Sequence, residues 1–268
     1  MSQAESGDAD GGEQSFISHL VELRERLLKA VAAVLIVLLP LLFFANKLYG
    51  WLALPLIRHL PQGGTMIATE VASPFLTPLK LAFFVALFIA IPVVLYQLWA
   101  FVAPGLYRSE KRLAVPILVS AVLLFYIGCA FAYFLVLPAV FTFMTSVAPA
   151  GVAVMPDIGR YLDFVLMLFL AFGLCFEVPV VLVILVALGV VTPDQLAGSR
   201  RYAIVGAFVI AAVLTPPDVL SQTMLAVPMC LLYEVGIFGA RTLTAGKSST
   251  SADDNPSATD EAGRRADS

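Results

Sequence analysis

Residues 30–46 read AVAAVLIVLLPLLFFAN, a stretch without a charged side chain. A helix rises about 1.5 Å per residue, so a helix over this stretch roughly matches the hydrocarbon core of a bilayer. The whole chain has the same character, with 60% hydrophobic and 13% charged residues among 268. Soluble domains contain about 45–50% apolar and about 25% charged residues. The sequence therefore predicts a membrane protein and not a soluble globular enzyme.

Two more apolar blocks follow in the first half of the chain. Residues 81–107 are uncharged, with Pro92 as the expected kink. The block after Leu113 is too long for one crossing, and we divide it into a span over 116–137, ending near Pro138, and an outer segment.

The second half supplies three further spans. Residues 161–191 are interrupted by Asp163 near the start and by Glu177 near the middle. Two segments around a TPPD turn then form a hairpin, whose first arm is short for a full crossing, about 20 Å at helical rise. We therefore predict an all-α polytopic membrane protein with six transmembrane helices, at 30–46, 81–107, 116–137, 161–191, 202–214 and 219–240.

Basic residues set the orientation. Six spans place both ends on one side, and 12 of the 16 basic residues lie on that side: Arg24, Arg26, Lys29, Arg108, Lys111, Arg112, Arg200, Arg201, Arg241, Lys247, Arg264 and Arg265. By the positive-inside rule both termini are predicted to be cytoplasmic. Residues 1–14 and 242–268 are polar and are expected to be disordered cytoplasmic tails around a membrane domain at 15–241.

Motifs for catalysis are absent from the sequence. It contains no phosphate loop, no HExxH zinc motif and no GxSxG nucleophile elbow. The three cysteines, Cys129, Cys175 and Cys230, each lie in an apolar block without metal-ligand spacing. We expect no enzymatic activity, no cofactor, no metal and no nucleic-acid partner.

Two acids lie on the predicted cytoplasmic face. Residues 16–29 form an amphipathic helix in which Glu22 and Arg26 are four residues apart, the spacing of an exposed ion pair. Glu110 stands among basic residues, as a solvated acid would. Alternatively, both are carboxylates that accept a planar guanidinium in bidentate geometry, which would select a ligand containing arginine.

Glu177 is predicted near the middle of a span. An ionised carboxylate there costs several kcal/mol, so the residue is a functional candidate. The alternative is a neutral acid hydrogen-bonded within the bundle, helped by carbonyls loosened around Pro179.

The last hairpin has a polar tip that includes Thr215, Asp218, Ser221 and Gln222. Asp218 or Ser221 could cap the last helix. The patch could also bind a helix of another subunit, because polar side chains associate helices in membranes.

Five segments together resemble one family. They are SHLVELRERLLKA, LPQGGTMIATEVASPFLTPLK, LYQLWAFVAPGLYRSEKR, FEVPVV and GAFVIAAVLTPPDVLSQTMLAVPM. In this order, over about 16–241, the chain resembles TatC, the polytopic core subunit of the twin-arginine protein translocase.

The resemblance implies a concave, glove-like bundle in the cytoplasmic (inner) membrane. It implies binding of twin-arginine signal peptides of folded precursor proteins, single-span TatA and TatB partners in a multimeric complex among membrane lipids, and export driven by the proton-motive force.

The resemblance also implies roles for individual residues. Glu22, Glu110, Phe101 and Arg24 match the signal-peptide site, Thr215 and Gln222 match a contact for a partner helix, and Glu177, Pro55 and Asp218 match other positions associated with function.

Two other classes stay open from the residues alone. A proton-coupled secondary transporter could use Glu177. A membrane scaffold would have no ligand of its own.

Overall fold

The structure is a computed structural model that describes residues 7–59, 66–102, 111–147, 155–214 and 219–253. Every named element in this part of the chain is a helix, and the one β-bridge joins Ile67 to Asp157. The predicted all-α class is therefore confirmed. The chain divides into two compact units, Met1–Gly173 and Leu174–Ser268, which are described separately.

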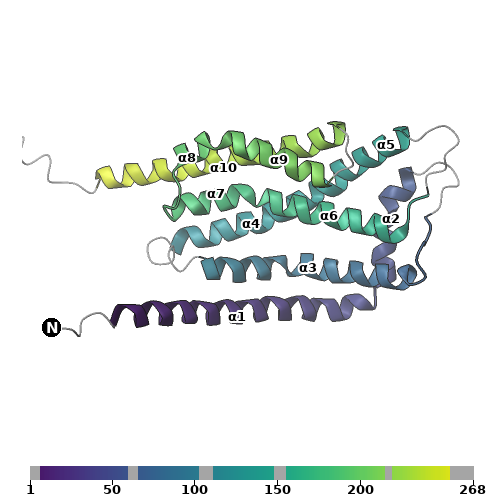
Figure 1. Ribbon diagram of the computed structural model, residues 1–268, viewed down its shortest axis with the longest axis horizontal. Coiled ribbons are helices and arrows are strands. Elements are labelled where there is room, and N and C mark those ends of the chain that lie inside the picture. The colour runs from purple at the N-terminus through teal and green to yellow at the C-terminus, as the bar shows by residue number, and fades with distance from the viewer. Residues whose placement is uncertain (1–6, 60–65, 103–110, 148–154, 215–218, 254–268) are drawn as a thin grey trace, which may run out of the picture. The chain divides into compact units, whose positions relative to one another are not determined.

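The first unit begins with a bent pair of helices. Helix α1 (Gly7–Leu42) carries Pro40 in its last turn, and α2 (Ala45–His59) follows after a bend of 88° (Figure 1). Pro40 has no N–H to donate to the preceding turn, and α1 ends two residues after it. The first predicted span, 30–46, therefore stops at Leu42 and does not continue straight through residue 46.

The remaining helices of this unit are α3 (Ser73–Val102), α4 (Lys111–Phe131), η1 (Ala132–Val136), α5 (Leu137–Val147) and α6 (Ile158–Phe176), whose last residues belong to the second unit. Helix α1 lies along α3 (Figure 1), with Val34 packed in one cluster with Ala86 and Ala90. Small residues at such a contact let two membrane helices approach closely.

The third predicted span is longer than expected. Helices α4, η1 and α5 follow one another directly, and the apolar span runs over Val115–Phe143 instead of ending near Pro138. The N–H of Leu137 bonds to the carbonyl of Ala132, five residues back. This wider π-turn lies directly before Pro138, so the helix continues past a residue that cannot donate.

The second unit contains α7 (Val178–Ala187), α8 (Pro193–Gly198), α9 (Arg200–Leu214) and α10 (Val219–Asp253), with α10 packed against α7 and α9. Helix α7 ends in a Schellman motif: Gly189 has φ 73°, and the N–H of Val190 bonds to the carbonyl of Leu185. Thr192 and Gln195 then form a capping box that begins α8.

Four helices in the described part are long and apolar enough to span a membrane, and the bent α1–α2 pair brings the number to five. Helix α9, with 15 residues, is shorter, as expected for the first arm of the hairpin. These spans are consistent with the six predicted.

Helical structure also extends into the segments predicted as tails, since α1 begins at Gly7 and α10 ends at Asp253. Adding residues to an existing helix is far easier than starting a new one.

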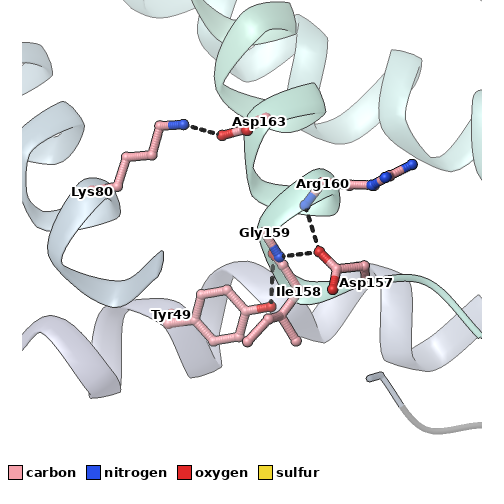
Figure 2. Close-up of polar contacts among 7 residues, drawn as sticks. All are labelled: Tyr49, Lys80, Asp157, Ile158, Gly159, Arg160 and Asp163. Carbon is pink, nitrogen blue, oxygen red and sulfur yellow. Dashed lines mark hydrogen bonds and ion pairs between the residues drawn. The ribbon is translucent and has the colours of Figure 1, made fainter. Parts of the chain in front are cut away.

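The segment before α3 is joined to the start of α6 by the Ile67–Asp157 bridge and by hydrogen bonds to the Asp157 carboxylate. Asp157 Oδ2 accepts hydrogen bonds from the backbone N–H and the hydroxyl of Thr69, at 2.8 and 2.7 Å. Its Oδ1 accepts from the N–H groups of Gly159 and Arg160 at 2.9 and 3.0 Å (Figure 2). We call these four residues the Asp157 clasp.

The clasp favours the ionised carboxylate. Hydrogen bonds hold the pKa of Asp157 well below its ordinary value. The largest effect comes from the N–H of Arg160, followed by the hydroxyl and the N–H of Thr69. A carboxylate at a helix N-terminus also interacts favourably with the helix dipole.

We expect Gly236→Ala to destabilise the second unit. A Cβ at this position would lie 2.6 Å from Leu182 Cδ1 and 3.0 Å from Pro179 Cα, which forces α10 away from α7. Such overpacking costs about 1–3 kcal/mol. The matched control is Gly206→Ala on α9, where a Cβ meets nothing within 4 Å. Thermal unfolding in detergent should show a lower melting temperature for Gly236→Ala alone, and equal melting temperatures would contradict the packing.

We expect Asp157→Asn to lower thermal stability only where the wild-type carboxylate is ionised. Its pKa is lowered on folding, so its contribution is fully present above the ordinary value, about 3.9, and is lost as the pH falls further. The difference in melting temperature between wild type and variant should be constant from pH 8 to about pH 5 and should shrink below about pH 4. Glu25→Gln, an exposed acid on α1, is the control. A difference that does not depend on pH would refute the clasp's electrostatic role.

Candidate functional site

Glu22 lies on the amphipathic part of α1 and forms the predicted pair with Arg26. Arg26 Nε and Nη2 both donate to Oε1 of Glu22, at 3.0 and 2.5 Å. The Glu22 side chain is 39% exposed and that of Arg26 is 24% exposed. The second carboxylate oxygen is not used by Arg26, so Glu22 holds one guanidinium while keeping an acceptor for another.

The other predicted members of the signal-peptide site are only partly visible. Arg24 is exposed on α1, and Phe101 is half-buried near the end of α3 and engaged in contacts there. Glu110 lies outside the described residues. The joint site of Glu22 and Glu110 stays a prediction. Pro55, predicted at the outer face, lies within α2.

Glu177 separates α6 from α7 and is buried, with 9% of its surface exposed. The helical hydrogen bonds persist around it, because its N–H bonds to Leu174 and its carbonyl accepts from Val181. Within the described part of the chain, its side-chain Oε1 has no hydrogen-bond partner. For this atom the structure does not support the predicted alternative of a hydrogen-bonded acid, and Glu177 remains an unusual polar group inside an apolar span.

Gln222 connects the two arms of the last hairpin. Its Nε2 donates to the backbone carbonyl of Phe208 on α9, at 3.1 Å. Thr223 beside it donates back to Val219 in its own helix, at 2.6 Å. Thr215 and Asp218 lie outside the described residues.

A cavity of about 630 Å³ in the first unit was not anticipated from the sequence. It is bounded by α1, α3 and α6, and its polar lining comes from Glu70, Ser73, Thr77, Lys80 and Asp163. Lys80 and Asp163 form an ion pair between α3 and α6, drawn in Figure 2. We call these five residues the polar end of the cavity.

The sequence near α6 indicates the role of Asp157 as a helix cap but not the Lys80–Asp163 ion pair. Asp157 stands directly before α6, the position that a helix-capping acid prefers, so its role as a cap was readable from the sequence. The partners Lys80 and Asp163 are 83 residues apart, and no local pattern pairs them. In the residues that the structure describes, no group of three His, Cys, Asp or Glu side chains could hold a metal ion.

Comparisons with known proteins agree with one another. The model of the family described as "Sec-independent protein translocase protein (TatC)" matches residues 18–228. The chain is 60% identical over 230 residues to the TatC protein of Halothiobacillus neapolitanus, covering 86% of this chain and 63% of that protein's length. It is 56% identical over 228 residues to the TatC protein of Escherichia coli K12, covering 85% and 88%.

A solved structure is also similar. The crystal structure described as "Twin Arginine Translocase Receptor- TatC" superposes with a TM-score of 0.74 at 40% identity, covering 84% of this chain and 99% of that one. Sequence and fold lead to the same assignment: this multi-pass membrane protein belongs to the TatC family of Sec-independent protein translocase proteins.

Proposed function

We propose that this chain binds the twin-arginine signal peptides of folded precursor proteins at the cytoplasmic face of the inner membrane. Membership of the TatC family supports the proposal, as does similarity to a structure described as a twin-arginine translocase receptor. The excess of basic residues on the side of the termini supports cytoplasmic ends for a membrane domain at 15–241.

The Glu22–Arg26 pair is the observation that carries this proposal. The carboxylate already binds a guanidinium through two nitrogens, at a partly exposed position. An exposed pair four residues apart contributes only about 0.3–0.5 kcal/mol, so an arginine of the signal peptide can replace Arg26 or use the second oxygen at small cost. Glu110 supplies the second carboxylate in this proposal, with Phe101 and Arg24 at the edge of the site.

Partner recruitment is the second part of the proposal. Gln222 uses one N–H on Phe208 and keeps a second donor and a carbonyl oxygen. In this proposal Thr215 adds a hydroxyl to the contact. On the neighbouring α9, Val205 and Val209 are 63% and 58% exposed. An apolar helix surface beside a polar side chain suits the single spans of TatA and TatB, which would assemble with this subunit into a larger complex.

The mechanism requires binding and assembly, and no bond is made or broken by this chain. Signal-peptide binding recruits the partners, the apolar part of the signal inserts along the concave face that the family resemblance implies, and the proton-motive force drives transport. Glu177, buried at a helix break, keeps a polar group at mid-span during assembly. The relatives reported above are protein translocase proteins, so the transporter hypothesis is not carried further.

We expect Glu22→Gln and Glu110→Gln each to weaken signal-peptide binding about tenfold, since a hydrogen bond to a charged group is worth about 1.5–3 kcal/mol. Photocrosslinking from a probe beside the arginine pair of a signal peptide would measure this. Glu25→Gln, three residues along the same helix, is the control. Arg26→Gln should strengthen binding about twofold by freeing Glu22. Undiminished crosslinking in the Glu22→Gln, Glu110→Gln double variant would rule out the site.

We expect Gln222→Leu to reduce crosslinking between α10 and the partner helices about threefold, because hydrogen bonds between membrane helices average about 0.6 kcal/mol. Thr223→Val is the matched control, since that hydroxyl is already bonded within its own helix. Signal-peptide binding should stay unchanged in both variants. A partner yield that is equal for the two variants would exclude Gln222 from the contact.

A further inference from the structure

The cavity between α1, α3 and α6 changes from polar to apolar along its length. Ser73, Thr77 and Lys80 line it from successive turns of α3, and Phe83 follows one turn further into the helix. At about 1.5 Å per residue, the first three span about 10 Å of depth. Leu38 and Leu42 of α1 and Leu162 of α6 add apolar walls, and Asp163 of α6 adds a carboxylate at the polar end. This is the gradient of a lipid molecule, from headgroup to acyl chain.

Two buried hydroxyls form the floor of the polar end. Ser73 and Thr77 are only 7% and 5% exposed. In the described part of the chain, neither hydroxyl is hydrogen-bonded to another residue. A Cβ on Gly159 would lie 3.5 Å from Ser73 Oγ and 3.6 Å from Thr77 Oγ1, so the space in front of both exists because residue 159 is glycine. A hydroxyl can both donate and accept, so these two groups can donate hydrogen bonds to an anionic ligand in the cavity.

The charges at the polar end are of both signs. Lys80 reaches across to Asp163, which lies one turn after Gly159 (Figure 2), and both side chains are about half exposed. Glu70 adds a second carboxylate to the lining. One ammonium beside two carboxylates complements a ligand that carries one anion and one cation with N–H donors.

We propose that this cavity binds one phospholipid with a zwitterionic, primary-amine headgroup. The phosphate accepts hydrogen bonds from Lys80, Ser73 and Thr77, and the ammonium donates to Glu70 and Asp163. An acyl chain lies along Leu38 and Phe83. A glycerol headgroup lacks the cation and meets an excess of negative charge, and a choline headgroup lacks the N–H donors. The volume, about 630 Å³, lies within the range of small-molecule pockets, about 300–1,000 Å³. The inference does not depend on the Glu22 site.

Native mass spectrometry of the full chain in detergent tests the headgroup. Dioctanoyl phosphatidylethanolamine should bind about tenfold more tightly than dioctanoyl phosphatidylglycerol or phosphatidylcholine. The Glu70→Gln, Asp163→Asn double variant should remove this preference, because the two carboxylates distinguish the amine. Glu25→Gln, an exposed acid on α1 outside the cavity, should keep it. Equal binding of the three lipids by the wild type, or an unchanged preference in the double variant, would overturn the proposal.

Fluorescence locates the lipid without altering a charge. In Phe83→Trp, one equivalent of phosphatidylethanolamine with brominated chains should quench the new tryptophan in detergent. Phe75→Trp on the same helix, exposed and outside the cavity lining, should be quenched much less. Equal quenching at both positions would show that the lipid has no preference for the cavity.

Discussion

Backbone hydrogen bonding in hydrocarbon is the constraint on which this structure depends. A peptide N–H or C=O in the bilayer core finds no water, so each must bond within the protein, and the apolar segments become helices. Lipid is as apolar as the side chains that face it, so burial of apolar surface does not hold such helices together. Close approach does, at Ala86 and Ala90 between α1 and α3 and at Gly236 between α10 and α7.

The same constraint governs the places where helices break. After Pro40 the N–H of Phe44 bonds back to Leu41, and in η1 the N–H of Leu137 bonds back to Ala132. At Glu177 the backbone N–H bonds to Leu174 and the carbonyl accepts from Val181, while the side-chain Oε1 has no partner in the described part of the chain. A break that keeps its backbone bonds can be tolerated within a span, which is how a buried carboxylate comes to lie there.

Sequence reasoning succeeded where the determinants are local. The length of the uncharged stretches predicted where the spans lie. The four-residue spacing of Glu22 and Arg26 predicted the ion pair that the structure contains. It failed where a feature depends on distant segments or on subtle helix geometry. The cavity needs α1, α3 and α6 together, and the passage of a helix beyond Pro138 needs a π-turn that no residue pattern announced. The site residues in the inner loop and the hairpin turn remain predictions, since they lie outside the described part of the chain.

Charged groups in this fold differ in how readily they can exchange partners. Glu22 with Arg26, and Lys80 with Asp163, are partly exposed pairs near the ends of apolar spans. Such pairs contribute little stability, so a guanidinium or a headgroup can replace one member without a large loss. Glu177 is different, because a buried carboxylate cannot replace a lost partner with water. It costs several kcal/mol if it is ionised without a partner. The two proposed ligand sites therefore use the exchangeable pairs at the ends of the spans, and the mid-span acid is suited to rearrangement of helices around it.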